Sequence, residues 1–181
     1  MKDLLKQIQN CKKCGLYKTR IMPTIYCGNI KSKIMFIGEA PGKNEDETGV
    51  PFCGRAGKIL DELLNYINFK REDVYITNIV KCRPPKNRDP KESEIKKCGC
   101  FLEKQIKFVN PKIICPLGRF SSKYILKKYF KKSFEIGEVH GKVFKINNIF
   151  VIPMYHPAAA IYDNKKIDIL KKDFKVIINN L

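Results

Sequence analysis

The stretch KIMFIGEAPG (33–42) decides the fold. Its first half, KIMFI, is an apolar run that passes directly into a glycine-rich loop. A short apolar run bounded by turn residues predicts a strand that is buried on both faces. Strands of this kind are typical of parallel sheets, because helices cover both faces of such a sheet.

Three more apolar runs repeat this arrangement along the chain. The runs predicted to be strands are VYITNIV (74–80), KIICPLG (112–118) and IFVIP (149–153). Helical spacing or a helix-start signal predicts four helices, KILDELLNYI (58–67), DPKESEIKKCGCFLEKQIKFV (89–109), SSKYILKKYF (121–130) and DILKKDFKVIINNL (168–181). The weakly alternating stretch 134–153 predicts a hairpin before the last strand. We therefore predict an α/β fold, a single three-layer domain with a central four-stranded parallel sheet flanked by helices.

The composition is strongly basic. Lys and Arg number 36 and Asp and Glu 18 among 181 residues, which gives a net charge of +18. This excess favours a polyanionic partner such as nucleic acid, although a lysine-rich solvated surface would have the same composition. The sequence has no apolar run long enough to span a membrane and no signal-peptide core at its start. We therefore expect a cytoplasmic protein of prokaryotic type that acts as a monomer without membrane contact.

The cysteines indicate a metal site. Cys11 and Cys14 form a CxxC pair in CKKCG, and no second CxxC occurs among the eight cysteines. In a reducing compartment such a set indicates metal binding rather than disulfides. Because a closed thiolate site needs four ligands, two more must come from single cysteines elsewhere. Four thiolates suit zinc nearly as well as an iron–sulfur cluster.

Distinctive loop-like stretches lie at or near the ends of all four predicted strands: GEAPG, TN, PLG and HP. The carboxyl ends of parallel strands meet at one edge of the sheet, so we predict the active site there. The loop GEAPGK is not a phosphate-binding P-loop, because three residues rather than four separate Gly38 from Gly42. Of the two histidines, His156 is expected to be functional, and His140 to be exposed or on an edge strand.

Three stretches together resemble the family 4 uracil-DNA glycosylases, the iron–sulfur branch of their superfamily. They are GEAPGKNEDETGVPFCGRAG (38–57), TNIVKCRPPKNRDP (77–90) and YHPAAA (155–160). The resemblance implies one domain over residues 1–181, with an N-terminal cluster-binding segment at about 1–30.

The implied activity is DNA repair. Such an enzyme flips uracil out of DNA and hydrolyses its N-glycosidic bond, which releases uracil and leaves an abasic site. Two alternatives remain open: a glycosylase of the same fold that acts on hypoxanthine or xanthine, and a non-catalytic iron–sulfur or zinc module that binds nucleic acid.

The resemblance also implies a structural [4Fe–4S] cluster. The matching ligands are Cys11, Cys14, Cys82 and Cys98. Cys100 competes with Cys98, but residues two apart on a helix point about 200° apart, so only one can face the cluster. Cys115 is expected in the core.

The resemblance and the residue chemistry together suggest a uracil pocket. Phe52 is expected to stack on the base, and the amide of Asn78 to pair with O4 and N3–H, a pattern that cytosine reverses. His156 is expected to donate a hydrogen bond to O2 as negative charge develops on the leaving uracil.

Three residues are candidates for the group that activates or positions the attacking water. Better-known uracil glycosylases have GQDPY in the first loop, and here Ala40 stands in place of that Asp and offers only backbone atoms to the substrate. Glu39 is the favoured catalytic carboxylate. Glu45 and Asn87 are second choices for substrate discrimination or for positioning water. Ile161 or Tyr162 is expected to fill the gap in the duplex that the flipped base leaves.

Overall fold

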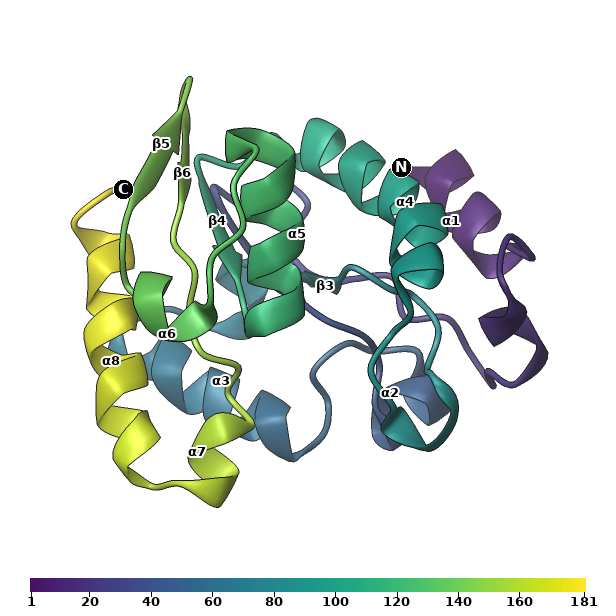
Figure 1. Cartoon of the computed structure of the whole chain (residues 1–181), viewed down its shortest axis with the longest axis horizontal. Coiled ribbons are helices and arrows are strands. Elements are labelled where there is room, and N and C mark those ends of the chain that lie inside the picture. Colours follow the sequence, from purple (N-terminus) through teal and green to yellow (C-terminus); the bar gives the residue numbers. More distant parts are fainter.

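The computed structural model describes residues 1–181, and its centre is a six-stranded sheet (Figure 1). The strand order is β1-β3-β2-β4-β6-β5. The four inner strands pair in parallel and are those predicted: β2 (Ile34–Gly38), β3 (Tyr75–Asn78), β4 (Ile113–Pro116) and β6 (Ile149–Val151). The edges are antiparallel, formed by β1 (Cys27–Gly28) and β5 (Phe144–Ile146). The predicted α/β class and parallel centre are confirmed, whereas the predicted count of four strands is too low.

Strand β2 lies between two hydrophobic cores, one on each face of the sheet. Met35 and Ile37 pack into the core on one face, and Ile34 and Phe36 into the core on the other. This division follows from the strand geometry, because successive side chains point to opposite faces of a sheet. The Phe36 ring stacks on Phe174 with 5.5 Å between ring centroids, which joins the strand to the C-terminal helix. Burial on both faces is what the apolar run predicts.

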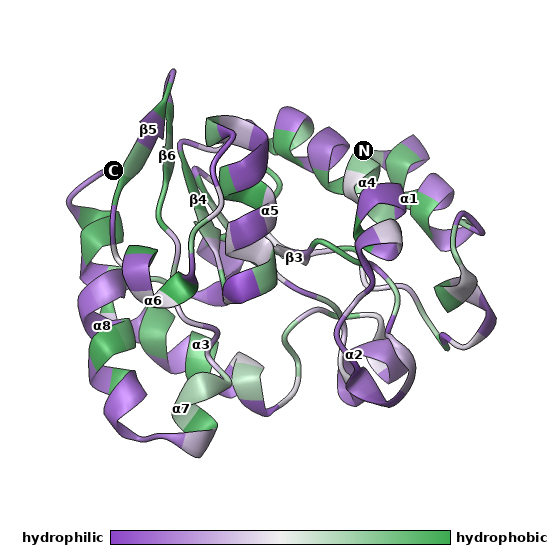
Figure 2. Ribbon diagram, viewed as in Figure 1, coloured by the Kyte–Doolittle hydropathy of each residue, from purple (hydrophilic) through white to green (hydrophobic).

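Helices cover both faces of the sheet and complete the three layers (Figure 1). One core is covered by α1 (Lys2–Gln9), α4 (Glu92–Val109) and α5 (Arg119–Phe130), and the other by α3 (Arg55–Tyr66) and α8 (Lys165–Ile178). Figure 2 shows that these helices carry hydrophobic and hydrophilic residues on different sides, as expected of helices that cover a sheet. None of the helices combines the length and apolar composition needed to cross a lipid bilayer.

Short helices and 3₁₀ turns occur in several segments where none was predicted. They are α2 (Lys43–Thr48), α6 (Ile136–Val139) and α7 (Ala159–Tyr162), with 3₁₀ turns η1 (Gly15–Lys18), η2 (Arg71–Asp73) and η3 (Pro85–Asn87). The hairpin predicted over 134–153 is therefore limited to β5 and β6. The expectation for His140 is also wrong. It follows α6, is partly buried, and its Nδ1 lies 3.0 Å from Oδ2 of Asp173.

The topology brings several loops to one edge of the sheet. The chain goes from β2 to β3 on one side and then crosses to β4 on the other side of β2. The carboxyl end of β2 is therefore a switch point, where open α/β sheets form a crevice for ligands. The loops that follow β2, β3 and β6 surround this point.

Candidate active site

A cavity of about 520 Å³ opens at the carboxyl edge of the sheet. This volume lies within the usual range for small-molecule sites, about 300–1,000 Å³. The loops after β2 and β3 form much of its wall, and the segment that follows β6 contributes the rest. The sequence-predicted residues that line it are Glu39, Ala40, Glu45, Phe52, Asn78, Asn87 and His156.

Asn78 ends β3 beside Gly38, the last residue of β2. The residue is only 3% exposed, and its side-chain amide makes no hydrogen bond within the protein, so its donor and acceptor are free to pair with a ligand. A Cβ added at Gly38 would lie 2.2 Å from Oδ1 of Asn78 and 2.6 Å from the ring of Phe52. Gly38 is therefore the residue that lets the amide and the ring lie side by side.

Phe52 and His156 form a stacked pair beside Asn78. Their ring centroids are 5.5 Å apart and their planes differ by 23°. Phe52 has a φ of 55°, in the left-handed region that bulky residues rarely adopt. Gly118 passes behind His156, where an added Cβ would lie 3.0 Å from the histidine Cβ. The ring pair therefore depends on the left-handed backbone of Phe52 and on the absence of a side chain at Gly118, which packs against His156.

The tautomer of His156 follows from its hydrogen bond. The backbone N–H of Ala158 donates to Nδ1 at 3.1 Å, so Nδ1 is the acceptor. Burial lowers the pKa of His156 to about 4, so the imidazole is neutral near pH 7. A neutral imidazole whose Nδ1 accepts carries its proton on Nε2. The ring can therefore offer a neutral N–H donor to the cavity.

The two carboxylates that line the cavity, those of Glu39 and Glu45, differ in what they bind. Burial raises the pKa of Glu39 to about 7, with a further contribution from Asp89 that Arg119 opposes. Glu45 uses both of its oxygens on backbone N–H groups, at 3.1 Å to Gly42 and 3.2 Å to Gly54. Glu39 is thus the carboxylate that can take up and release a proton near neutral pH, and Glu45 holds two walls of the cavity together.

The outer rim carries Asn87 and the short helix α7. Asn87 is exposed, and its Oδ1 accepts a hydrogen bond from Nε of Arg83 at 2.7 Å. Ile161 and Tyr162 also line the rim, and Tyr162 is 89% exposed. An aromatic side chain so exposed beside a cavity is available to contact a large ligand.

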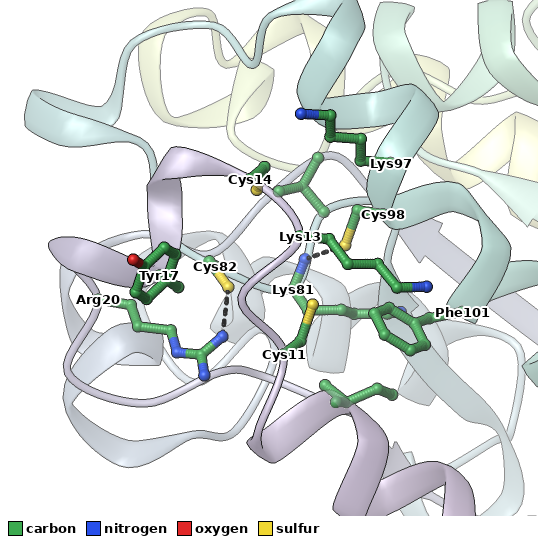
Figure 3. Close-up of a pocket in the computed structure, with 12 residues that line it drawn as sticks. Cys11, Lys13, Cys14, Tyr17, Arg20, Lys81, Cys82, Lys97, Cys98 and Phe101 are labelled. Carbon is green, nitrogen blue, oxygen red and sulfur yellow. Dashed lines mark hydrogen bonds between the residues drawn. The ribbon is translucent and has the colours of Figure 1, made fainter.

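A second, narrow cavity lies between the N-terminal segment, the loop after β3 and α4 (Figure 3). Four sulfur atoms surround it, those of Cys11, Cys14, Cys82 and Cys98. Cys100 does not line this cavity, and its Sγ instead accepts a hydrogen bond from Nζ of Lys13. The four cysteines expected from the resemblance therefore face a common space, although they are far apart in the sequence.

Two of these sulfur atoms accept hydrogen bonds. Nη1 of Arg20 lies 3.0 Å from Sγ of Cys82, and the backbone N–H of Lys81 donates to Sγ of Cys98 at 3.3 Å. Burial raises the pKa of the Cys98 thiol to about 12, so its thiolate requires a bound cation near neutral pH. Cys115 is fully buried in the opposite core, as expected.

Lys81 links the two cavities, although no motif or spacing in the sequence singles it out. Its side chain is only 1% exposed, although lysine is almost never fully buried. Nζ donates to Oγ1 of Thr77 at 2.7 Å, to Oε1 of Gln105 at 2.5 Å and to the backbone carbonyl of Asn78 at 2.5 Å. Nζ therefore has three acceptors, and burial lowers the pKa of Lys81 to about 7. The residue next to Cys82 therefore also fixes the backbone of Asn78.

Fold, cavity and sequence comparison together define the class of this protein. The family model described as the uracil DNA glycosylase superfamily matches residues 25–181. The chain belongs to this superfamily.

Its relatives narrow the assignment. The type-4 uracil-DNA glycosylase of Archaeoglobus fulgidus is 44% identical, over 97% of this chain and 90% of the relative. That of Saccharolobus solfataricus is 49% identical, over 94% of this chain and 82% of the relative. That of Sulfurisphaera tokodaii is 46% identical, over 98% of this chain and 83% of the relative. Within the superfamily, the chain belongs to the type-4 branch.

Proposed function

We propose that this protein is a DNA-repair hydrolase that excises uracil from DNA and leaves an abasic site. The observation that carries the proposal is the meeting of Phe52, Asn78 and His156 around one cavity in a chain of the type-4 branch. A base inside a duplex cannot reach such a cavity, so the nucleotide has to be flipped out of the stack. The net charge of +18 suits a polyanionic substrate.

Asn78 selects the base in this proposal. Its amide donates to O4 of uracil and accepts from N3–H, and no protein group competes for either atom. Cytosine presents a donor where uracil has O4 and an acceptor where uracil has N3–H. A buried amide facing cytosine would leave both sides unpaired, which is an effective form of rejection.

His156 and Glu39 act on the glycosidic bond. The Nε2–H of His156 donates to O2, where negative charge develops as the bond between C1′ and N1 breaks. The ring is neutral, so it stabilises the uracil anion without having to transfer a proton. Glu39, with a pKa of about 7, orients the attacking water and takes its proton, because a base is most effective when its pKa lies near the working pH.

Glu45, Ala40 and Asn87 have supporting roles in this proposal. Both oxygens of Glu45 hold the backbone of the cavity wall, which favours positioning over proton transfer. Ala40 leaves room for the base and presents only backbone atoms. Asn87 lies at the exposed rim and is proposed to position water or the DNA strand. Ile161 and Tyr162 fill the gap left by the flipped nucleotide.

We also propose that Cys11, Cys14, Cys82 and Cys98 hold a [4Fe–4S] cluster. Their shared cavity and the two hydrogen bonds to sulfur support this donor set. Four thiolates suit a single zinc ion nearly as well as a cluster, and the similarity to the iron–sulfur branch of the superfamily favours the cluster. When bound, it would act structurally, tying the N-terminal segment to α4 and the loop after β3.

The remaining expectations complete the proposal. Residues 1–181 form one glycosylase domain, with a cluster-binding segment at about residues 1–30. The substrate is uracil-containing DNA, on which the protein acts as a monomer in the cytoplasm.

A base-release assay tests the proposed function. Oligonucleotides containing uracil, hypoxanthine, xanthine or a mismatched thymine are incubated with purified protein, and the released base and the abasic site are measured. Release of uracil in clear preference to the other bases is the expected result. Preferential release of hypoxanthine or xanthine would establish the alternative lesion, and DNA binding without release of any base would establish a binding module.

A further inference from the structure

Arg71 lies outside the cavity but binds the loop that carries Phe52. It begins the short turn η2, between α3 and β3, and does not line the cavity. Its Nη2 donates to the carbonyl of Phe52 at 2.8 Å and to that of Gly57 at 3.3 Å, and its Nη1 donates to the carbonyl of Pro51 at 3.1 Å. One guanidinium thus donates to three backbone carbonyls and fixes them relative to one another.

Contacts with Cys27 and Asp61 hold the guanidinium itself in place, and the first is a hydrogen bond of 3.5 Å from Nη1 to Sγ of Cys27. The guanidinium Nε donates to Oδ1 of Asp61 on α3 at 2.9 Å, and Nη2 lies 2.8 Å from the same oxygen. The side chain is 27% exposed. A planar fork with five N–H donors suits this arrangement, whereas the single ammonium of lysine cannot reach the same acceptors together.

The backbone that Arg71 binds is the strained part of the site. Phe52 has a φ of 55°, a conformation that a bulky residue keeps only when its surroundings enforce it. The Phe52 carbonyl also lies directly against Gly57, where an added Cβ would be 1.7 Å from its oxygen. Gly57 makes room for this carbonyl, and Arg71 supplies the donor that binds it. The ring of Phe52 can then lie against His156 at the floor of the cavity.

We propose that Arg71 is a positioning residue that sets the stacking face of the base pocket through the backbone of Phe52. The inference rests on the proposed function of the cavity. Without the guanidinium, the Phe52 carbonyl loses its donor and the left-handed residue loses its restraint, so the ring leaves the position in which a flipped base stacks on it. The predicted defect is in holding the base, not in binding DNA or the cluster.

Arg71→Lys tests this inference, because it keeps the charge and the stem but removes the fork. The measurements are the inhibition constant of free base, KM and kcat for base release, binding to undamaged DNA, bound iron and the thermal midpoint. We expect the inhibition constant and KM to rise about tenfold, while DNA binding and bound iron stay at wild-type levels. Guanidinium ion added to Arg71→Ala should restore part of the affinity for free base.

Two controls separate positioning from general stability. Asp61→Asn removes the charge of the ion pair but keeps an Oδ1 acceptor for Nε of Arg71, so the guanidinium stays in place with its carbonyl contacts and the inhibition constant should stay near that of the wild type. In a Phe52→Leu background, Arg71→Lys should produce little further change, because the ring that it positions is already gone. Equal losses in Arg71→Lys and Asp61→Asn, or full additivity with Phe52→Leu, would overturn the inference.

The base used in these measurements is whichever one the wild-type protein releases. A different lesion would therefore overturn the proposed function and leave the test of Arg71 intact. An unchanged inhibition constant in folded Arg71→Lys would overturn the inference and leave the proposed function intact. Release of no base by the wild type would overturn both.

Discussion

Replacing His156 by Ala removes one defined hydrogen-bond donor from the proposed site. Ala158 fixes Nδ1 as an acceptor at 3.1 Å, so the lost group is the Nε2–H. Loss of one preorganised donor to a developing oxyanion costs about 2.7–4 kcal/mol in the barrier. Loss of the stacked pair with Phe52 adds about 0.5–1.5 kcal/mol. The single-turnover rate should therefore fall by at least about 100-fold, which corresponds to about 2.7 kcal/mol.

The assay is single-turnover release of uracil with enzyme in saturating excess over a labelled oligonucleotide. Under this condition a weaker affinity for DNA does not affect the rate, so the measured loss belongs to the chemical step. His156→Gln is the matched variant, because its amide keeps an N–H donor but has no ring. It should recover part of the lost rate. Binding to undamaged DNA should be the same in both variants and in the wild type.

The dependence of the free energy of unfolding on pH can be measured on the same variants. The pKa of His156 is about 4 in the folded protein against an ordinary value of 6.5, so the unfolded state takes up the proton first as the pH falls. Its contribution to the free energy of unfolding is therefore present above about pH 6.5 and lost between about 6.5 and 4. His156→Gln should show a smaller decrease over this interval. A near wild-type rate of uracil release by His156→Ala would refute both its role and the choice of cavity.

Four further predictions concern the carboxylate, the amide, the cysteines and the charge. In the wild type, the single-turnover rate should rise with pH through about 7 and then level off, because only ionised Glu39 accepts the proton from water. A Glu39→Gln variant that kept this rise would contradict the assignment of Glu39 as the base. Asn78→Asp should reduce uracil release by about 100-fold or more by replacing the donor to O4 with a charge, with partial recovery at low pH, and an unchanged rate would remove Asn78 from base reading. Single Ala replacements at the four proposed ligands should remove the brown colour and the bound iron and lower the thermal midpoint. Ser at the other four cysteines should keep the iron. Loss of iron from Cys100→Ser with retention in Cys98→Ala would reverse the roles of these two cysteines. Affinity for undamaged DNA should fall by about a thousandfold between about 50 and about 200 mM salt, and a flat response would show that the positive charge is not used on DNA.

The sequence was sufficient to predict the inner part of the sheet. Each inner strand is a β-branched or apolar run, fully buried in β2, β3 and β4 and partly buried in β6, so composition and length alone reveal it. The edge strand β1 has only two residues, and its pairing with β3 is a matter of backbone hydrogen bonds, which leave no side-chain pattern. The helix α2, KNEDET, has no apolar face to reveal it, and α6 is only one turn long.

The site was partly predictable for a related reason. The residues proposed to touch the base, Phe52 and Asn78, carry recognisable chemistry. Asn78 ends β3, and Phe52 lies in the segment between β2 and α3. Arg71 and Lys81 act through backbone carbonyls, and nothing in the local sequence identifies which carbonyl a distant cation will meet. Glu45 illustrates the same limit, because its spacing within the loop did not show that both of its oxygens bind backbone N–H groups.

The segment from Asn78 to Cys82 is held by hydrogen bonds at each of its three inner residues, so its length is fixed. This restricts how the enzyme can evolve. The backbone N–H groups of Ile79 and Val80 donate to the carbonyls of Gly38 and Glu39, and that of Lys81 donates to Cys98. An insertion or deletion among these three residues would turn the amide of Asn78 away from the cavity or move Cys82 away from its partners. New lesion specificities can therefore arise by side-chain replacement in the segment from Asn78 to Cys82, but not by changes in the length of this segment. Exposed turns such as the one between β5 and β6 remain free to vary in length.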